Sequence, residues 1–110
     1  MILDKATVRN LELTNNYYLG TMENSLFSIL NNTNTRMGTR LLYGWILNPL
    51  ISKKEIDERL KIVEIFFQNQ NLLDLVREKL EGINDIERIV GKIGLNRVNA
   101  RDLKALQVSL

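Results

Sequence analysis

Residues 51–80 have the sequence ISKKEIDERLKIVEIFFQNQNLLDLVREKL, which decides the fold class. Ser52 and Glu55 have the spacing of a capping box, because the serine hydroxyl can accept from the Glu55 amide while the Glu55 side chain reaches back to Ser52. Asn71 predicts the start of a second helix and Gly82 predicts its end. Within the first helix, apolar residues recur at the spacing of one face: Ile56, Leu60, Val63 and Phe67. The stretch therefore predicts two consecutive amphipathic helices.

Similar signals precede this stretch. Residues 26–30 indicate a short helix, and Thr33 or Thr35 can cap a longer one. The longer helix ends before Pro49, since proline lacks the backbone N–H that a further turn would need. Its apolar residues share one face, which we expect to be buried: Met37, Leu41, Leu42, Trp45 and Ile46.

Two more helices are indicated in the last third of the chain. Asn84 with Glu87 predicts a second capping box, opening a helix that ends at Gly94, and Asn99 with Asp102 predicts a third. Leucines keep the helical period to the last residue: Leu103, Leu106 and Leu110. We interpret this open end as a fragment cut inside a helix, and we expect its exposed apolar face to favour self-association.

The first 24 residues lack a helical pattern. Thr7-Val8 and the alternation in Leu11-Glu12-Leu13 predict a short extended segment or edge strand, and the residues after it predict a loop. We therefore expect a mainly α, multihelical fold in a single unit. Its parts are an N-terminal strand and loop in 1–24 and helices in 25–110, together making one domain over 1–110.

Composition limits the possible functions. Of the 110 residues, 45% are hydrophobic and 25% charged, the balance of a globular protein, and no apolar run approaches the length of a membrane span. Cysteine and histidine are both absent, which excludes disulfides and thiolate ligands and removes the usual general base at neutral pH. The net charge of +2 is too small to indicate a nucleic-acid surface by itself.

No constellation indicates catalysis. The phosphate-binding pattern G-x-x-x-x-G-K-[ST] does not occur, and Gly91-Lys92 lies inside a helical pattern. The neighbouring carboxylates Asp57 and Glu58 are interpreted as a solvated helix face, and no base is available to activate a hydroxyl. We therefore expect no active site, no cofactor and no metal ion within this chain.

The arginines and the C-terminal cations allow two interpretations each. Arg40, Arg59 and Arg88 are favoured as structural ties that hold helix ends and loops through bidentate hydrogen bonds, with solvent or partner contacts as the alternative. The cations at the C-terminal end outnumber the single Asp102, and they either lie in solvent or face phosphates. These cations are Lys92, Arg97, Arg101 and Lys104.

Five short motifs in order resemble one family, the MutS DNA mismatch repair ATPases. The motifs are LDKATVRNLEL at 3–13, TNTRMGTRLL at 33–42 continuing through Trp45 to Pro49, EI with RL at 55–60, DIERI at 85–89, and RDL at 101–103. They are similar to the first part of the helical core, or lever, domain of that family. The residues that carry the resemblance are Asp4, Thr7, Asn10, Glu12, Gly38, Arg40, Trp45, Pro49, Arg59, Asp85, Glu87, Arg88, Arg101 and Asp102. The sequence departs from the family at Lys92, where arginine is common, and at Thr39, where a second glycine is common.

The resemblance implies a place in a larger protein. Proteins of this family are dimeric clamps with a mismatch reader, a connector, a helical core, a DNA clamp and an ATPase, so ATP and Mg²⁺ would bind outside this chain. The implied role is a rigid, close-packed core segment that couples the mismatch-binding and clamp regions to the ATPase. Its implied partners are the rest of the MutS chain and, for the longer protein, mismatched DNA. The implied location is the cytoplasm, or the nucleus in a eukaryote, with no membrane contact.

Two other classes remain open from the sequence. A stand-alone helical module for protein interaction or regulation would bind a partner between its helices. A small DNA-binding protein would use the C-terminal cations, with an affinity that falls steeply with salt.

Overall fold

The computed structural model describes residues 1–110 and contains seven helices and no strand. The helices are α1 (Lys5–Asn10), α2 (Leu26–Leu30), α3 (Arg36–Leu47), α4 (Lys53–Gln68), α5 (Gln70–Glu81), α6 (Ile86–Gly94) and α7 (Ala100–Ser109). The predicted mainly α, multihelical fold is confirmed.

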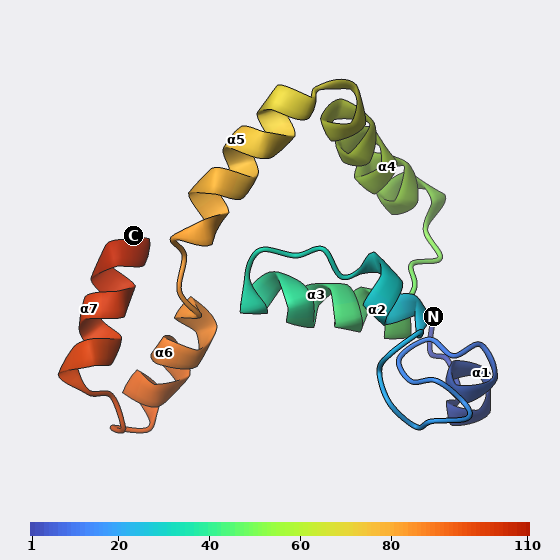
Figure 1. The fold of residues 1–110 in the computed structure, drawn as a ribbon, viewed down its shortest axis with the longest axis horizontal. Coiled ribbons are helices and arrows are strands. Elements are labelled where there is room, and N and C mark those ends of the chain that lie inside the picture. Colours follow the sequence, from blue (N-terminus) through green and yellow to red (C-terminus); the bar gives the residue numbers. More distant parts are fainter.

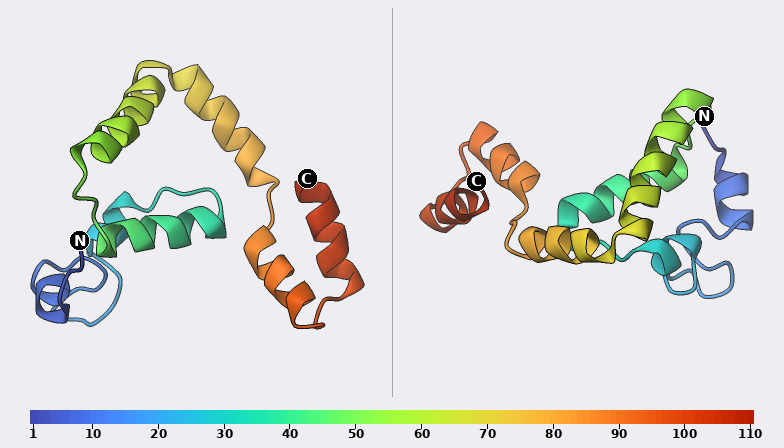
Figure 2. Two further views of the ribbon diagram at one scale, coloured as in Figure 1. Left: turned by 180° about the vertical axis from the view of Figure 1, so that it is seen from behind. Right: turned by 90° about the horizontal axis from the view of Figure 1, so that it is seen from above.

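The helices form an open arch around α3 (Figure 1). Helices α4 and α5 make the arch, α6 and α7 return as a hairpin at one end, and α1 with its long loop lies at the other end. Seen from behind and from above, the hairpin and α1 stay at opposite ends of the molecule (Figure 2). The most extensive contacts between helices are those of α2 with α3, α4 with α5, and α6 with α7.

Three predicted helix starts are confirmed. The Thr35 hydroxyl accepts from the Gly38 amide at 3.0 Å at the start of α3, and the Ser52 hydroxyl accepts from the Glu55 amide at 3.5 Å at the start of α4. The second bond of the predicted Ser52 capping box, from the Ser52 amide to the Glu55 side chain, is not formed. Asn99 forms the full capping box at α7, where its side chain accepts from the Asp102 amide and the Asp102 carboxylate accepts from the Asn99 amide. Helix α3 ends at Leu47, two residues before Pro49, as predicted.

Two predicted caps are wrong. Asn69, not Asn71, caps α5, and its side chain accepts from the Leu72 amide at 3.0 Å. Asp85, not Asn84, caps α6, because Asn84 is held by α7 instead. The Asn84 side-chain amide donates to the carbonyl of Ala105 at 3.1 Å and to the hydroxyl of Ser109 at 3.0 Å. An ionised Asp85 also suits the positive end of a helix dipole better than an amide does.

The predicted N-terminal strand is wrong, since residues 5–10 form helix α1. The Asp4 carboxylate accepts from the Thr7 amide at 2.7 Å and caps this helix. The cap outweighs the weak β preference of Thr7-Val8, and no second strand exists in the chain to pair with an extended segment. The loop predicted after residue 13 is confirmed up to the start of α2.

The core is small. Only five residues are buried: Leu13, Thr14, Ser25, Phe27 and Ile89. Four of them lie where the turn after α1 meets the start of α2, and the Phe27 ring packs edge-on against Tyr43 of α3 at 5.3 Å between ring centroids. The other buried residue, Ile89, lies in α6.

The expected buried faces and close packing are wrong for this chain. Trp45 is 43% exposed, Val63 61% and Phe67 87%. The accessible surface is 8914 Å², whereas a compact monomer of this mass exposes about 6,200 Å². The radius of gyration is 17.1 Å, against about 13 Å for a compact domain of this length. The helices are therefore well formed while most of their apolar faces lie open.

No helix is both long enough and apolar enough to span a membrane.

Candidate functional site

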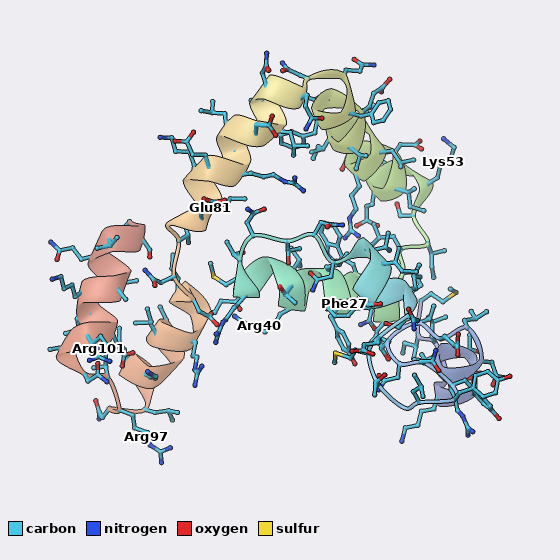
Figure 3. The ribbon with its side chains drawn as sticks, viewed as in Figure 1. Phe27, Arg40, Lys53, Glu81, Arg97 and Arg101 are labelled. Atoms are coloured by element: carbon cyan, nitrogen blue, oxygen red, sulfur yellow. The ribbon has the colours of Figure 1, made fainter.

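Arg40 of α3 donates four hydrogen bonds to two carboxylates at the beginning of α6. Its Nη1 and Nη2 atoms donate to the two carboxylate oxygens of Asp85 at 2.8 and 2.7 Å. Its Nε and Nη2 atoms donate to Glu87 Oε2 at 3.2 and 2.6 Å. Arg40 lies on the side of α3 that faces α6 (Figure 3). The predicted bidentate tie is confirmed for Arg40.

This cluster is the sole polar link between the two ends of the molecule. No other hydrogen bond or ion pair joins residues 1–50 to residues 82–110. Between these segments the chain runs through the arch of α4 and α5. The cluster therefore closes a ring whose other connection is the chain itself.

The hydrogen bonds of the cluster keep Arg40 positively charged and Asp85 negatively charged. Hydrogen bonds from Arg40 lower the pKa of Asp85 to about 2, opposed by partial burial and helped by the Arg88 amide. The same contacts with Asp85 and Glu87 raise the pKa of Arg40. Both groups thus stay ionised at neutral pH, so the cluster suits mechanical linkage and not proton transfer.

Gly38 allows Thr33 and Thr35 to pack closely against the first turn of α3, because glycine has no Cβ. A Cβ added there would lie 3.1 Å from the Thr35 hydroxyl and 3.4 Å from Thr33 Cβ. Thr39 ties the same turn, because its hydroxyl bonds with that of Thr33 at 2.7 Å. These contacts fix the first turn of α3 and hence the direction of Arg40.

Trp45 and Arg59 join α3 to α4 in a way that the sequence did not predict. The Arg59 guanidinium lies over the Trp45 ring, 3.8 Å from its centroid. Arg59 therefore stacks by a cation–π contact, and the bidentate hydrogen bonds predicted for it are absent. The core position predicted for Trp45 is wrong, since the ring is covered by Arg59 on one face and the side chain remains exposed to solvent.

The α6–α7 hairpin has its own ion pair. Lys92 Nζ donates to Asp102 Oδ1 at 2.6 Å, and this contact lowers the pKa of Asp102. The structural tie predicted for Arg88 is wrong, because its guanidinium makes no hydrogen bond or ion pair, and only its backbone amide contacts the Asp85 side chain. Arg101 is exposed, and its side chain makes no hydrogen bond or ion pair.

The N-terminal motif shapes the turn that holds the small core. Glu12 adopts a φ of +48° after α1, and its carboxylate accepts from the Tyr17 amide at 2.6 Å. The backbone carbonyl of Glu12 accepts from the Leu26 amide at 3.0 Å, so the turn also anchors the start of α2. Asn10 is exposed and makes no side-chain hydrogen bond, and the Pro49 carbonyl accepts from the amino group of Met1 at 2.9 Å.

A cavity of about 580 Å³ lies between α1, the loop after it and the end of α3. Sequence reasoning missed it, because no motif marks a space that three distant segments enclose. Arg9, which lies over the Tyr17 ring at 4.7 Å from its centroid, contributes to the lining together with Lys5 and Tyr43. No acidic side chain contributes to the lining.

Gly91 lies within α6 and Lys92 is paired with Asp102, so this glycine-lysine pair forms no phosphate cradle. No group of three acidic side chains is arranged to hold a metal ion.

Comparison with known proteins agrees with the resemblance of the motifs. Residues 6–110 match the family described as MutS domain III. The chain is 50% identical over 110 residues to the DNA mismatch repair protein MutS of Thermosipho melanesiensis, 47% to that of Thermotoga maritima and 46% to that of Halothermothrix orenii. Each alignment covers 100% of this chain and 12–13% of the relative, so the chain spans about an eighth of their length. The chain belongs to the MutS family of DNA mismatch repair proteins and corresponds to a part of their domain III.

Proposed function

We propose that this segment couples the DNA-binding regions of a longer mismatch repair protein to an ATPase elsewhere in that protein. The observation that carries the proposal is the Arg40 cluster, the one polar joint between α3 and the α6–α7 hairpin. A joint of this kind can transmit displacement of one helix to another, because breaking it releases the hairpin from α3.

The open apolar faces support a role inside a larger assembly. Phe67 at 87% exposure and Val63 at 61% would be costly to leave in water, by about 25 cal/mol for each Å² of apolar surface. In this proposal the rest of the MutS chain covers these faces and completes a close-packed body with discrete arrangements.

The proposal includes a wider setting, which membership of the family supports. The longer protein is a dimer in the cytoplasm that binds mismatched DNA, and its ATP and Mg²⁺ sites lie outside residues 1–110. This segment itself carries out no chemistry.

The test compares two ion pairs in the full-length protein. Arg40→Gln breaks the joint between α3 and α6, whereas Lys53→Gln breaks the pair with Asp57 inside α4, at 2.6 Å. We expect mismatched duplex DNA to stimulate ATP turnover less in Arg40→Gln than in the parent, while turnover without DNA stays unchanged. Lys53→Gln removes a cation without separating two helices, so it keeps the full stimulation.

The proposal fails if Arg40→Gln and the parent respond equally to mismatched DNA. It also fails if Lys53→Gln loses as much stimulation as Arg40→Gln, since the effect would then come from the change in charge and not from the joint.

A further inference from the structure

The α6–α7 hairpin concentrates the positive charge of the chain. Residues 86–110 contain five basic and two acidic side chains and so carry +3, whereas the whole chain carries +2 and its other residues together carry −1. Helix α4, in contrast, has four basic and four acidic side chains. The positive charge is therefore segregated to one end of the molecule.

Both acidic groups of the hairpin are already engaged. Glu87 accepts from Arg40 of α3 at 2.6 Å, and Asp102 accepts from Lys92 at 2.6 Å. Neither carboxylate makes an ion pair with the remaining cations of the hairpin. Those cations are exposed to solvent: Arg88, Arg97, Arg101 and Lys104.

Three of these cations lie along the loop and the beginning of α7. Arg97 follows Asn96 in the loop, and Arg101 and Lys104 are three residues apart, which places them on one face of α7. All three residues are exposed, and their side chains make no hydrogen bond or ion pair. Figure 3 places Arg97 at the tip of the hairpin and Arg101 on α7, away from Arg40.

The loop that presents Arg97 is well anchored. The Arg97 amide donates to the Lys92 carbonyl at 2.9 Å, and the Lys92–Asp102 pair ties α6 to the first turn of α7. The three side chains are therefore displayed on a framework held by hydrogen bonds, although each side chain is free.

We propose that Arg97, Arg101 and Lys104 contact the phosphate backbone of duplex DNA. Duplex DNA carries one negative charge for about every 1.7 Å of its axis, and cations that neutralise phosphates gain affinity by releasing bound counterions. Contacts to phosphate carry no base information, so this surface holds matched and mismatched duplex equally. The inference rests on the proposed function in one respect, which is that the longer protein binds DNA.

The experiment measures DNA affinity against salt in the full-length protein. The test variant combines Arg97→Gln, Arg101→Gln and Lys104→Gln, and the probe is a fully matched duplex without nucleotide. We expect the slope of log Kd against log [KCl] to fall by about 2–3, at roughly 0.9 for each phosphate that is no longer neutralised. The matched control combines Lys61→Gln, Arg77→Gln and Lys79→Gln, which removes the same charge from α4 and α5 and keeps the parental slope.

An unchanged slope in the test variant overturns the proposal. An equal fall in the control also overturns it, because the effect would then be a long-range effect of net charge. Arg97→Gln alone, which lies outside any helix, gives a fall of about 1 and provides the same test if the triple variant loses helicity. Binding is measured without ATP, so this inference and the coupling through Arg40 can fail independently.

Discussion

Asn96 shows how a single residue ends a helix and starts the basic loop. Its φ is +54°, its amide donates to the Ile93 carbonyl at 3.0 Å, and the next amide donates to the Lys92 carbonyl at 2.9 Å. This pair of bonds is a Schellman motif, in which the left-handed position favours glycine and tolerates asparagine. Glu12 takes the same position after α1, with a φ of +48°.

Replacing Asn96 tests this account. We expect Asn96→Ala to destabilise the last turn of α6 by about 1 kcal/mol, because a Cβ without a compensating polar group is strained in the left-handed region. Asn96→Gly should be at least as stable as the parent. Amide hydrogen exchange at Ile93 and Gly94 reports the change, about five-fold faster in the alanine variant. Equal exchange in the alanine and glycine variants would show that the backbone there is not strained.

Helix caps were the residues most open to prediction from sequence. The local sequence is enough to predict the helix start where a good capping residue is followed at the right spacing by a polar or small residue, as at Thr35, Ser52 and Asn99. Where two polar neighbours compete, as with Asn84 and Asp85, the choice depends on α7, which binds Asn84 from 21 and 25 residues away. No local pattern contains that information.

At the scale of helices, α3 and α6 meet through charge and not through a packed apolar seam. The sequence predicted that Arg40 ties structural elements together, since a guanidinium suits bidentate pairing with a carboxylate. It did not predict that Asp85 would be both the cap of α6 and the partner of Arg40. Nothing in the sequence indicated the stacking of Arg59 on Trp45. Whether the Trp45 ring is buried or covered by a cation depends on how α3 and α4 lie relative to each other.

The contact between α3 and α6 should depend on pH in a defined direction. The pKa of Asp85 is lowered from 3.8 to about 2, chiefly by Arg40. A lowered pKa in the folded state means that the contact contributes fully above pH 3.8 and fades as the pH falls through about 2. Carbon NMR titration of the Asp85 carboxyl group should therefore give a midpoint near 2. In Arg40→Gln the midpoint should rise toward 3.8, and a midpoint that stays near 2 in this variant would assign the shift to the helix cap alone.

At the scale of the whole molecule, correct helices do not make a closed core. Periodicity predicted which residues lie on one face of each helix, but it could not show what that face packs against. The apolar faces of α4 and α5 remain open, and the surface exceeds that of a compact monomer by about 2,700 Å². The expectation of a close-packed body failed for this reason, since the seven helices do not cover one another's apolar faces.

The open faces lead to a prediction about the chain by itself. We expect the isolated 110-residue chain to self-associate in sedimentation and to bind a hydrophobic dye, because large exposed apolar patches favour association. Val63→Lys with Phe67→Lys should weaken both signals, since these positions are four residues apart on the exposed face of α4. Lys54→Gln with Lys61→Gln, which changes polar positions of the same helix, is the control and should keep both signals. A parent chain that stays monomeric at high concentration without binding dye would show that the arch closes on itself in solution.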